Sequence, residues 1–357
     1  MRNLTVEEQS AASSESSRSD NLWIMAWRRL RRNRVGMGSL VVVALFLLMV
    51  LLSFTGLIAK DWNKEVAVSY APPSFIATAS TAQSDAQQLS ADATLDATAQ
   101  VDLYGIEDPL AAEMSQIRSQ LTGQNEAQAE LQSSLAFGAD RWGQDIISKT
   151  IKGSETSIMV GLIAALLAVA IGTLLGAVSG YFGGWLDDLI NWFYNVFTSI
   201  PYMLLILAVA AVLQQKGMLS IILILGFTGW TGTYRLIRAE YMKHAQREYV
   251  MAAKAIGVNH YQRMFQHIFP NISHVVLVQM SILVVSFIKS EVILSFLGFG
   301  VPVGTVSWGS MLNEAQSEFI LGKWWQLVAA TAAMAILVTA FSLFTDALRD
   351  ALDPKIK

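Results

Sequence analysis

The chain has 357 residues, a formal net charge of −3, 53% apolar residues and only 15% charged residues. It contains no cysteine, which excludes disulfides, thiolate metal sites and cysteine nucleophiles. The few charges gather in a small number of segments, and the long uncharged runs between them are of the kind that cross a bilayer as helices.

Six apolar runs are long enough for this, since ~20 residues at ~1.5 Å rise per residue cross ~30 Å of hydrocarbon. We therefore expect an all-α polytopic membrane protein with six transmembrane helices, at 36–57, 157–180, 189–213, 219–237, 275–298 and 325–348. The first run is too long for a cleavable signal and is not followed by a small-residue cleavage site, so we expect it to be retained.

Basic residues gather before the first run, between the fourth and fifth runs, and after the last run. Residues 60–155, by contrast, hold six Lys or Arg against fourteen Asp or Glu. With six spans, all three basic segments fall on one side. Because cytoplasmic loops are rich in Lys and Arg, this predicts that both termini and the basic loop are cytoplasmic and that the acidic segment is not.

These patterns predict five parts of the chain. They are a cytoplasmic tail and amphipathic anchor at 1–35, a first transmembrane helix at 36–58, an extracytoplasmic segment at 59–156 with an insertion at about 77–134, a five-helix core at 157–348 with a cytoplasmic loop at 240–272, and a cytoplasmic tail at 349–357.

Several segments outside the spans have their own signatures. Residues 1–20 are rich in Ser and Glu and predict a disordered tail. Residues 21–34, NLWIMAWRRLRRNR, predict either an interfacial amphipathic helix or a basic topology anchor. The insertion predicts one or two weakly packed helices or a disordered tether, not a catalytic domain. Residues 137–162 predict a short amphipathic element that leads into the second span.

The polar segment 247–271, REYVMAAKAIGVNHYQRMFQHIFPN, predicts two short helices. Residues 248–256 are good helix formers, and Gly257 can end that helix because glycine tolerates positive φ. Asn259 or a neighbour can start a second helix, which we expect to end at Pro270.

The composition of this loop suits docking to a soluble partner. The small residues Ala252 and Ala253 would allow close approach to a partner's groove, and the flanking basic residues would favour an acidic rim or anionic headgroups. An ordinary amphipathic loop between two membrane helices would have a similar pattern.

Glu291 lies within the fifth span, two residues from Lys289. Ionisable residues at membrane depth are costly and usually face protein or water, so Glu291 is either a pathway or gate residue or an interhelical hydrogen-bond anchor. Pro201 can kink the third span, or can mark an ordinary helix start. A glycine-bracketed apolar hinge follows Glu291 and is a candidate gate; its residues include Leu294, Phe296 and Gly298.

Neither a metal site nor a catalytic site is expected. The four histidines are His244, His260, His267 and His274. The last three are spaced by seven residues, but the glycine and proline breaks prevent one helix from aligning them. No GxxxxGK[ST] phosphate loop occurs in the sequence, so the chain should not hydrolyse ATP and should bind no cofactor itself.

The loop resembles a known motif. Met251-Ala252-Ala253, then Gly257, then HIFP at 267–270 are similar to the "EAA" loop of ABC-importer permeases, and REYVMAAKAIG with HIFPN resembles the dipeptide/oligopeptide permease family, second membrane subunit. Further strings match in the family's order; they are FGADRWGQDIISKTIKGSETS, GYFGGWLDD, SIP, LSFLGFGVPVGTVSWGSML and RDALDPK. The resemblance covers nearly the whole chain from Trp27 except the insertion.

The resemblance implies a type I ABC-importer permease fold and the import of di- or oligopeptides across the bacterial inner membrane. It implies a sister permease as heterodimer partner, two ATPase subunits that use ATP and Mg, an extracytoplasmic solute-binding protein, a lipid surround and no nucleic acid. The residues that would couple to the ATPases are Glu248, Ala252, Ala253, Gly257, His267 and Pro270.

The chain departs from the family at Met251, where the motif's name has Glu, at Trp192 and Asn195, where the family usually shows Arg and Asp, and in its insertion. These departures bear on substrate identity more than on mechanism. The alternative is an ion-coupled secondary transporter with Glu291 and Lys289 as the coupling pair; a single pair without inverted repeats argues against it. A membrane protease would need a nucleophile and base at membrane depth, yet every histidine lies in or beside the loop.

Overall fold

A computed structural model describes residues 22–76, 131–302 and 304–352. The expected N-terminal tail at 1–20 and the insertion up to residue 130 lie outside the described residues, as do the last five residues of the expected C-terminal tail. Within the described part the chain consists of helices, turns and three isolated β-bridges.

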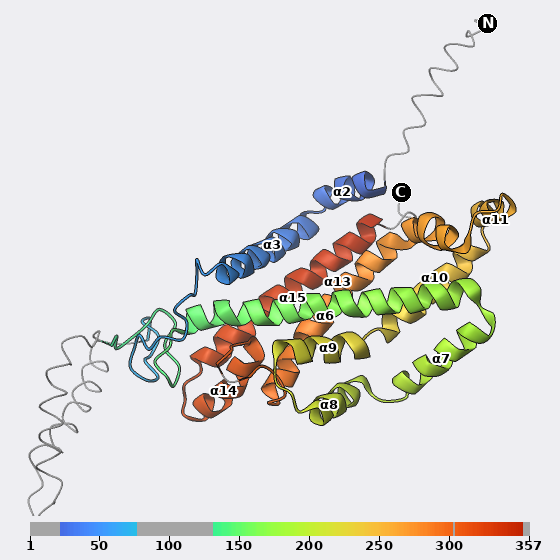
Figure 1. Cartoon of the computed structure of the whole chain (residues 1–357). Helices are drawn as coiled ribbons and strands as arrows, with labels where there is room; N and C mark the ends of the chain where they lie inside the picture. The colour runs from blue at the N-terminus through green and yellow to red at the C-terminus, as the bar shows by residue number, and fades with distance from the viewer. Residues whose placement is uncertain (1–21, 77–130, 303, 353–357) are drawn as a thin grey trace, which may run out of the picture.

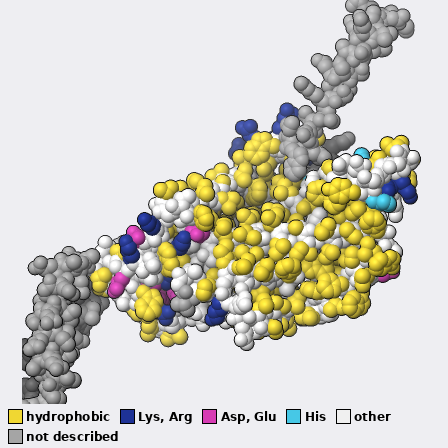
Figure 2. Space-filling model, in the orientation of Figure 1, with side chains coloured by type: hydrophobic (Ala, Val, Ile, Leu, Met, Phe, Trp, Pro, Cys, Tyr) yellow, Lys and Arg dark blue, Asp and Glu magenta, His cyan; other side chains and the backbone are white. Residues whose placement is uncertain are grey.

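Four described helices are long and apolar enough to cross a membrane, and they lie side by side (Figure 1). They are α3 (Arg34–Phe54), α6 (Ile146–Phe182), α13 (Phe269–Phe296, continuous with turns from His260) and α15 (Trp325–Leu352). Hydrophobic side chains cover the middle of the face seen in Figure 2, and the charged side chains lie toward its ends. This distribution is typical of a protein that spans a bilayer.

The predicted third span is a broken helix. α7 (Gly184–Thr198) and α8 (Tyr202–Leu213) are bent by 85° at the break between them. Pro201 is the residue that precedes α8. Proline has no N–H and disfavours helical conformation in the residue before it, which explains a break at this point.

The predicted fourth span is also divided, into α9 (Met218–Thr228) and α10 (Thr231–Ala245). The division falls at Gly229, where an added Cβ would lie 2.3 Å from Cζ of Phe287. By length and composition the described helices therefore provide four continuous spans, or five with the bent α7–α8 pair. The expected count of six is not confirmed.

The second span is much longer than its apolar run predicts. α6 begins at Ile146 because Asp145 caps it, with its carboxylate accepting hydrogen bonds from the backbone N–H groups of Ile147 and Ser148. The element expected at 137–162 does lead into the second span, but its last seventeen residues are already part of α6. Gly153 lies inside this helix, with Trp308 packed against it.

Small residues let α6 pack closely on its neighbours. Added Cβ atoms at Gly172, Gly176 and Gly180 would lie between 2.4 and 2.8 Å from backbone oxygens of α10 or the residue preceding it. An added Cβ at Gly161 would lie 2.4 Å from a side-chain carbon of Ile288 in α13. Close approach of this kind holds membrane helices together by van der Waals contact.

The two ends of the bundle carry different short elements. At one end lie α2 (Leu22–Arg32) and α11 (Glu248–Ala255), and at the other lies α14 (Trp308–Ile320) (Figure 1). α2 rests on α15, with Ala26 and Leu30 buried in a cluster with residues of the last turns of α15. The described part of the predicted 21–34 segment is thus mainly one helix, α2, which suits both the interfacial helix and the topology anchor.

Candidate functional site

The first helix of the 247–271 loop is α11, and it ends as the sequence predicts. Gly257 has φ +83°. Its N–H donates to the Lys254 carbonyl at 3.1 Å, and the Val258 N–H donates to the Ala253 carbonyl at 3.0 Å. This pair of hydrogen bonds is a Schellman motif, which needs a left-handed residue at the position of Gly257.

The second helix also starts where expected, at Asn259, whose Oδ1 accepts from the Gln262 N–H at 2.8 Å. The expectation that it ends at Pro270 is wrong. A short α-turn, α12 (His260–Gln262), leads into a π-helical turn, η2 (Arg263–Ile268), which runs directly into α13.

Pro270 is tolerated because it falls in the first turn of α13, next to the π-turn. The wider turn lets the Phe269 N–H bond to the Met264 carbonyl, five residues back. Pro270 has no N–H to donate to the preceding turn. The side chain of Asn271 supplies a donor there, since its Nδ2 donates to the His267 carbonyl at 2.6 Å. Such π-turns inside α-helices frequently occur at functional sites.

α11 has a buried face and an exposed face. Val250 and Ala253 are 3% and 6% exposed, and Val250 packs in a cluster with residues of α6, α10, η2 and α13. Ala253 is thus buried within the chain itself, whereas Ala252 is exposed. The exposed side also presents Met251 and Ile256, which are 55% and 81% exposed.

Aromatic and histidine side chains fix the loop to the long helices. Tyr181 of α6 contacts His260, with its hydroxyl 3.2 Å from Nδ1. In α10, His244 Nδ1 lies 2.8 Å from the Tyr249 hydroxyl, and burial lowers the pKa of His244 with a further contribution from Arg247. Both effects favour the neutral form of the His244 imidazole over the charged form.

The candidate pathway residues of α13 lie mostly inside the bundle. Glu291 is fully buried, and its Oε1 accepts from the Ser295 hydroxyl at 2.6 Å, while its Oε2 makes no hydrogen bond to a described side chain. Leu294 is also fully buried, and Phe296 is half-buried. Gly298, with φ +85°, ends the helix by a second Schellman motif. These positions support the anchor interpretation of Glu291.

Lys289 and Glu291 lie on different sides of α13 and do not form a pair. Two residues of an α-helix are separated by 200° around the axis, and Lys289 is exposed where Glu291 is buried. The pair expected of an ion-coupled transporter is absent from the described residues. On α7, the departures Trp192 and Asn195 are exposed, and Pro201 lies at the exposed bend.

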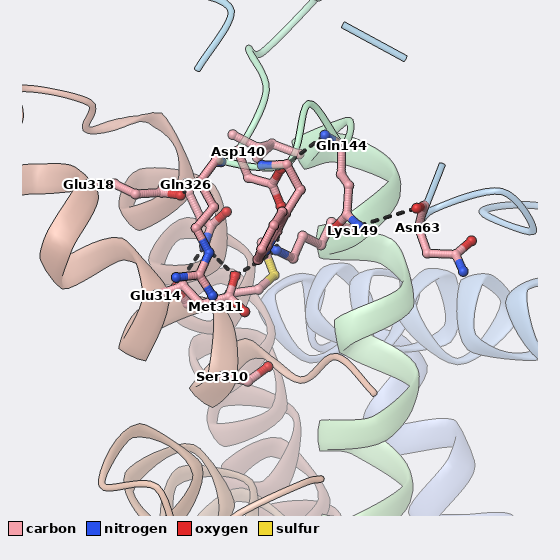
Figure 3. Close-up of polar contacts among 12 residues, drawn as sticks. Asn63, Asp140, Gln144, Lys149, Ser310, Met311, Glu314, Glu318 and Gln326 are labelled. Carbon is pink, nitrogen blue, oxygen red and sulfur yellow. Dashed lines mark hydrogen bonds and ion pairs between the residues drawn. The ribbon is translucent and has the colours of Figure 1, made fainter. Parts of the chain in front are cut away.

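The α14 end holds a buried ionic network that the sequence did not reveal (Figure 3). Lys149 of α6 is 3% exposed, and its Nζ lies 2.6 Å from Asp140 Oδ2 and 2.6 Å from Glu314 Oε2. Gln326 of α15 donates to the same Glu314 oxygen at 3.2 Å. The network thus joins α6, α14 and α15.

Glu318 lies beside this network and is itself buried. Its Oε1 accepts from the Arg141 N–H at 3.3 Å. Burial raises the pKa of Glu318 to about 7, although the Arg141 hydrogen bond acts in the opposite direction. Lys149 and Glu314 lie 165 residues apart, so no local sequence signal could have paired them.

Comparison with known proteins gives consistent matches. The family model described as "Binding-protein-dependent transport system inner membrane component" matches residues 172–357, and "N-terminal TM domain of oligopeptide transport permease C" matches residues 21–73. The dipeptide transport system permease protein DppC of Bacillus subtilis is 34% identical over 70% of this chain and 77% of its own length.

Two further relatives each cover 62% of this chain and 72% of their own length. The oligopeptide transport system permease protein OppC of Bacillus subtilis is 34% identical, and the glutathione transport system permease protein GsiD of Escherichia coli is 37% identical. Among solved structures, an inward-facing methionine ABC transporter, MetNI, aligns with a TM-score of 0.47 at 14% identity, over 58% of this chain and 98% of its own.

Proposed function

The chain belongs to the family of binding-protein-dependent transport system inner membrane components, and from this premise we propose that it is the second membrane subunit of an importer for di- or oligopeptides. As a permease subunit of an ABC transporter it is a non-catalytic, multi-pass membrane protein. The peptide substrate is supported by relatives named for dipeptide, oligopeptide and glutathione transport, since glutathione is itself a tripeptide.

The proposed orientation places the α11 end in the cytoplasm of a bacterium and the α14 end outside it. It is supported by the basic residues of α2 and of the 247–271 loop, because Lys and Arg near span ends favour the cytoplasmic side. In this orientation both termini are cytoplasmic. The five-part division of the chain, with its insertion at about 77–134, remains part of the proposal.

The proposed complex contains this chain, a sister permease, two ATPases that use ATP and Mg, and an extracytoplasmic solute-binding protein. The observation that carries the coupling role is the pair of exposed apolar side chains at the end of α11, Met251 in the helix and Ile256 at its C-cap, with Lys254 exposed between them in the sequence. Apolar side chains of one short helix inserted in a groove are a common mode of recognition.

Coupling would act through α11 as a rigid element. Its buried side is held by the cluster that contains Val250, so force on its exposed side reaches α6, α10 and α13. Closure of the ATPases would then exchange inward- and outward-facing states of the bundle, and docking of the binding protein would in turn favour closure.

The absence of cysteine permits a direct test. Ala252→Cys and Ala253→Cys place single thiols on neighbouring positions of α11, one exposed and one buried. In the isolated chain a water-soluble maleimide should label Ala252→Cys and leave Ala253→Cys unlabelled. In the assembled complex, bound ATPase should protect Ala252→Cys.

The same preparation tests transport. Reconstituted complex should take up peptide only with ATP and the binding protein. Equal labelling of Ala252→Cys with and without ATPases would contradict the docking role, and peptide uptake by the lone chain driven by a proton or sodium gradient would favour the secondary transporter.

A further inference from the structure

Lys289 is an exposed cation on α13 that has no counter-ion among the described residues. It forms no hydrogen bond or ion pair with any other described residue, whereas Lys149, the buried lysine of α6, has two carboxylate partners. At 1.5 Å rise per residue, Lys289 lies about 30 Å along α13 from Phe269 and about 10 Å from Phe296. It is therefore within the span and not at its end.

The side of α13 that holds Lys289 faces away from the rest of the chain. Ile282, Lys289 and Ile293 are exposed and Ser286 is half-buried, and these residues follow one another at spacings of four, three and four. Such spacing puts them on one stripe of the helix. Glu291 and the other fully buried residues of α13 occupy the remaining faces, against α6, α14 and α15.

A lysine at this depth is expensive unless an opposite charge or water faces it. The described part of the chain supplies no such charge, and the neighbours of Lys289 on the stripe are two isoleucines and a serine. The missing partner must be an anion that reaches this face from outside the described part of the chain. A carboxylate satisfies an ammonium group by a charge-assisted hydrogen bond.

We propose that Lys289 binds the carboxylate of a peptide as the peptide passes between this chain and its sister permease, with the Ser286 hydroxyl one turn away as a second donor. This inference rests on the proposed function, because every linear peptide with a free C-terminus carries the required group. It assigns Lys289 as a residue that selects for a free carboxylate. Glu291, on the opposite side of α13, has a structural role.

The test uses the whole reconstituted complex with its binding protein, and Lys289→Cys in this otherwise cysteine-free chain. The substrates are one peptide as the free acid and as the C-terminal amide, chosen so that the binding protein binds both. Lys289→Cys should lower ATP-driven uptake of the free acid about tenfold or more, because a hydrogen bond to a charged group is lost. Uptake of the amide should change little.

Chemical modification then restores or reverses the charge. Aminoethyl methanethiosulfonate, which adds an ammonium group, should restore uptake of the free acid, whereas the sulfonatoethyl reagent should not. The matched control is Ile293→Cys, one turn away on the same exposed stripe. It should react with both reagents without distinguishing the acid from the amide.

Three results would overturn the inference. Equal loss of uptake for the acid and the amide would show that the carboxylate is not recognised. Loss of the sister permease from the Lys289→Cys complex would assign the anion to that subunit, and a dependence on anionic lipid that is the same for both peptides would assign it to headgroups. A wild-type complex that imports no peptide would instead reject the proposed function itself.

Discussion

Replacing Gly257 by valine should uncouple the permease from its ATPases without unfolding it. Gly257 has φ +83° and closes α11 through a Schellman motif. No atom lies within 4 Å of the position that a Cβ would occupy. The cost of the substitution is therefore backbone strain alone, without a steric clash.

The magnitude follows from that geometry. A residue with a Cβ in the left-handed region costs roughly 1–2 kcal/mol, and β-branching makes such a conformation still less favourable. At about 1.4 kcal/mol per tenfold change, the equilibrium constant between the native loop conformation and its alternatives should fall about five- to thirtyfold. Peptide uptake and the ATPase activity stimulated by the loaded binding protein should fall together by about tenfold.

The assay compares three variants in the reconstituted complex. Gly257→Asn should keep most of the activity, because asparagine tolerates the left-handed region. Gly38→Val in α3 adds the same side chain where nothing lies within 4 Å and φ is not positive, so it controls for added bulk. Normal uptake and normal stimulation in Gly257→Val would refute the reasoning, as would equal losses in all three.

Other positions give contrasting outcomes. Lys149→Met should destabilise the chain by about 3–5 kcal/mol, because it leaves two carboxylates without their buried cation. The control Lys152→Met removes a partly exposed ion pair worth at most about 1 kcal/mol. Thermal unfolding of the two variants measures the difference. The pKa of Glu318 is raised by burial from 4.5 to about 7, so the folded chain holds a proton that the unfolded chain releases, and stability should fall as pH rises from about 4.5 to about 7 and then level off. Glu318→Gln should abolish this slope, and an unchanged slope in melting curves between pH 5 and 8 would contradict the assignment. Gly176→Val would place Cβ 2.8 Å from a backbone oxygen of α10 and should cost about 1–3 kcal/mol or more, seen as loss of folded protein that Gly38→Val does not suffer.

The sequence predicts features that depend on local chemistry. Gly257 and Asn259 could be assigned as the end and the start of helices, because positive φ and side-chain capping involve only residues within a few positions. The prediction that the helix ends at Pro270 is wrong, because whether a proline ends a helix depends on the geometry of the turn before it. The π-turn that accommodates it has no established sequence signature.

Features that depend on distant contacts could not be predicted. Lys149 and Glu314 are paired only because α6 and α14 meet at one end of the bundle. Glu291 and Lys289 are only two residues apart in the sequence, and helical geometry separates them around α13. Which of the two faces the core, however, is decided by the packing of α6 and α14.

The length of α6 has a mechanical consequence. Its 37 residues extend about 55 Å at 1.5 Å per residue, well beyond the ~30 Å of a bilayer's hydrocarbon. Lys149 in its first turns is fastened to α14, and Ala177 near its other end packs in the cluster beneath α11. A single uninterrupted rod thus connects the two ends of the protein, and a tilt of about 5° would displace its tips relative to each other by about 5 Å, roughly one helical turn. Such a rod works as a lever, which converts a small rotation into a large movement at its tips without any intermediate joint.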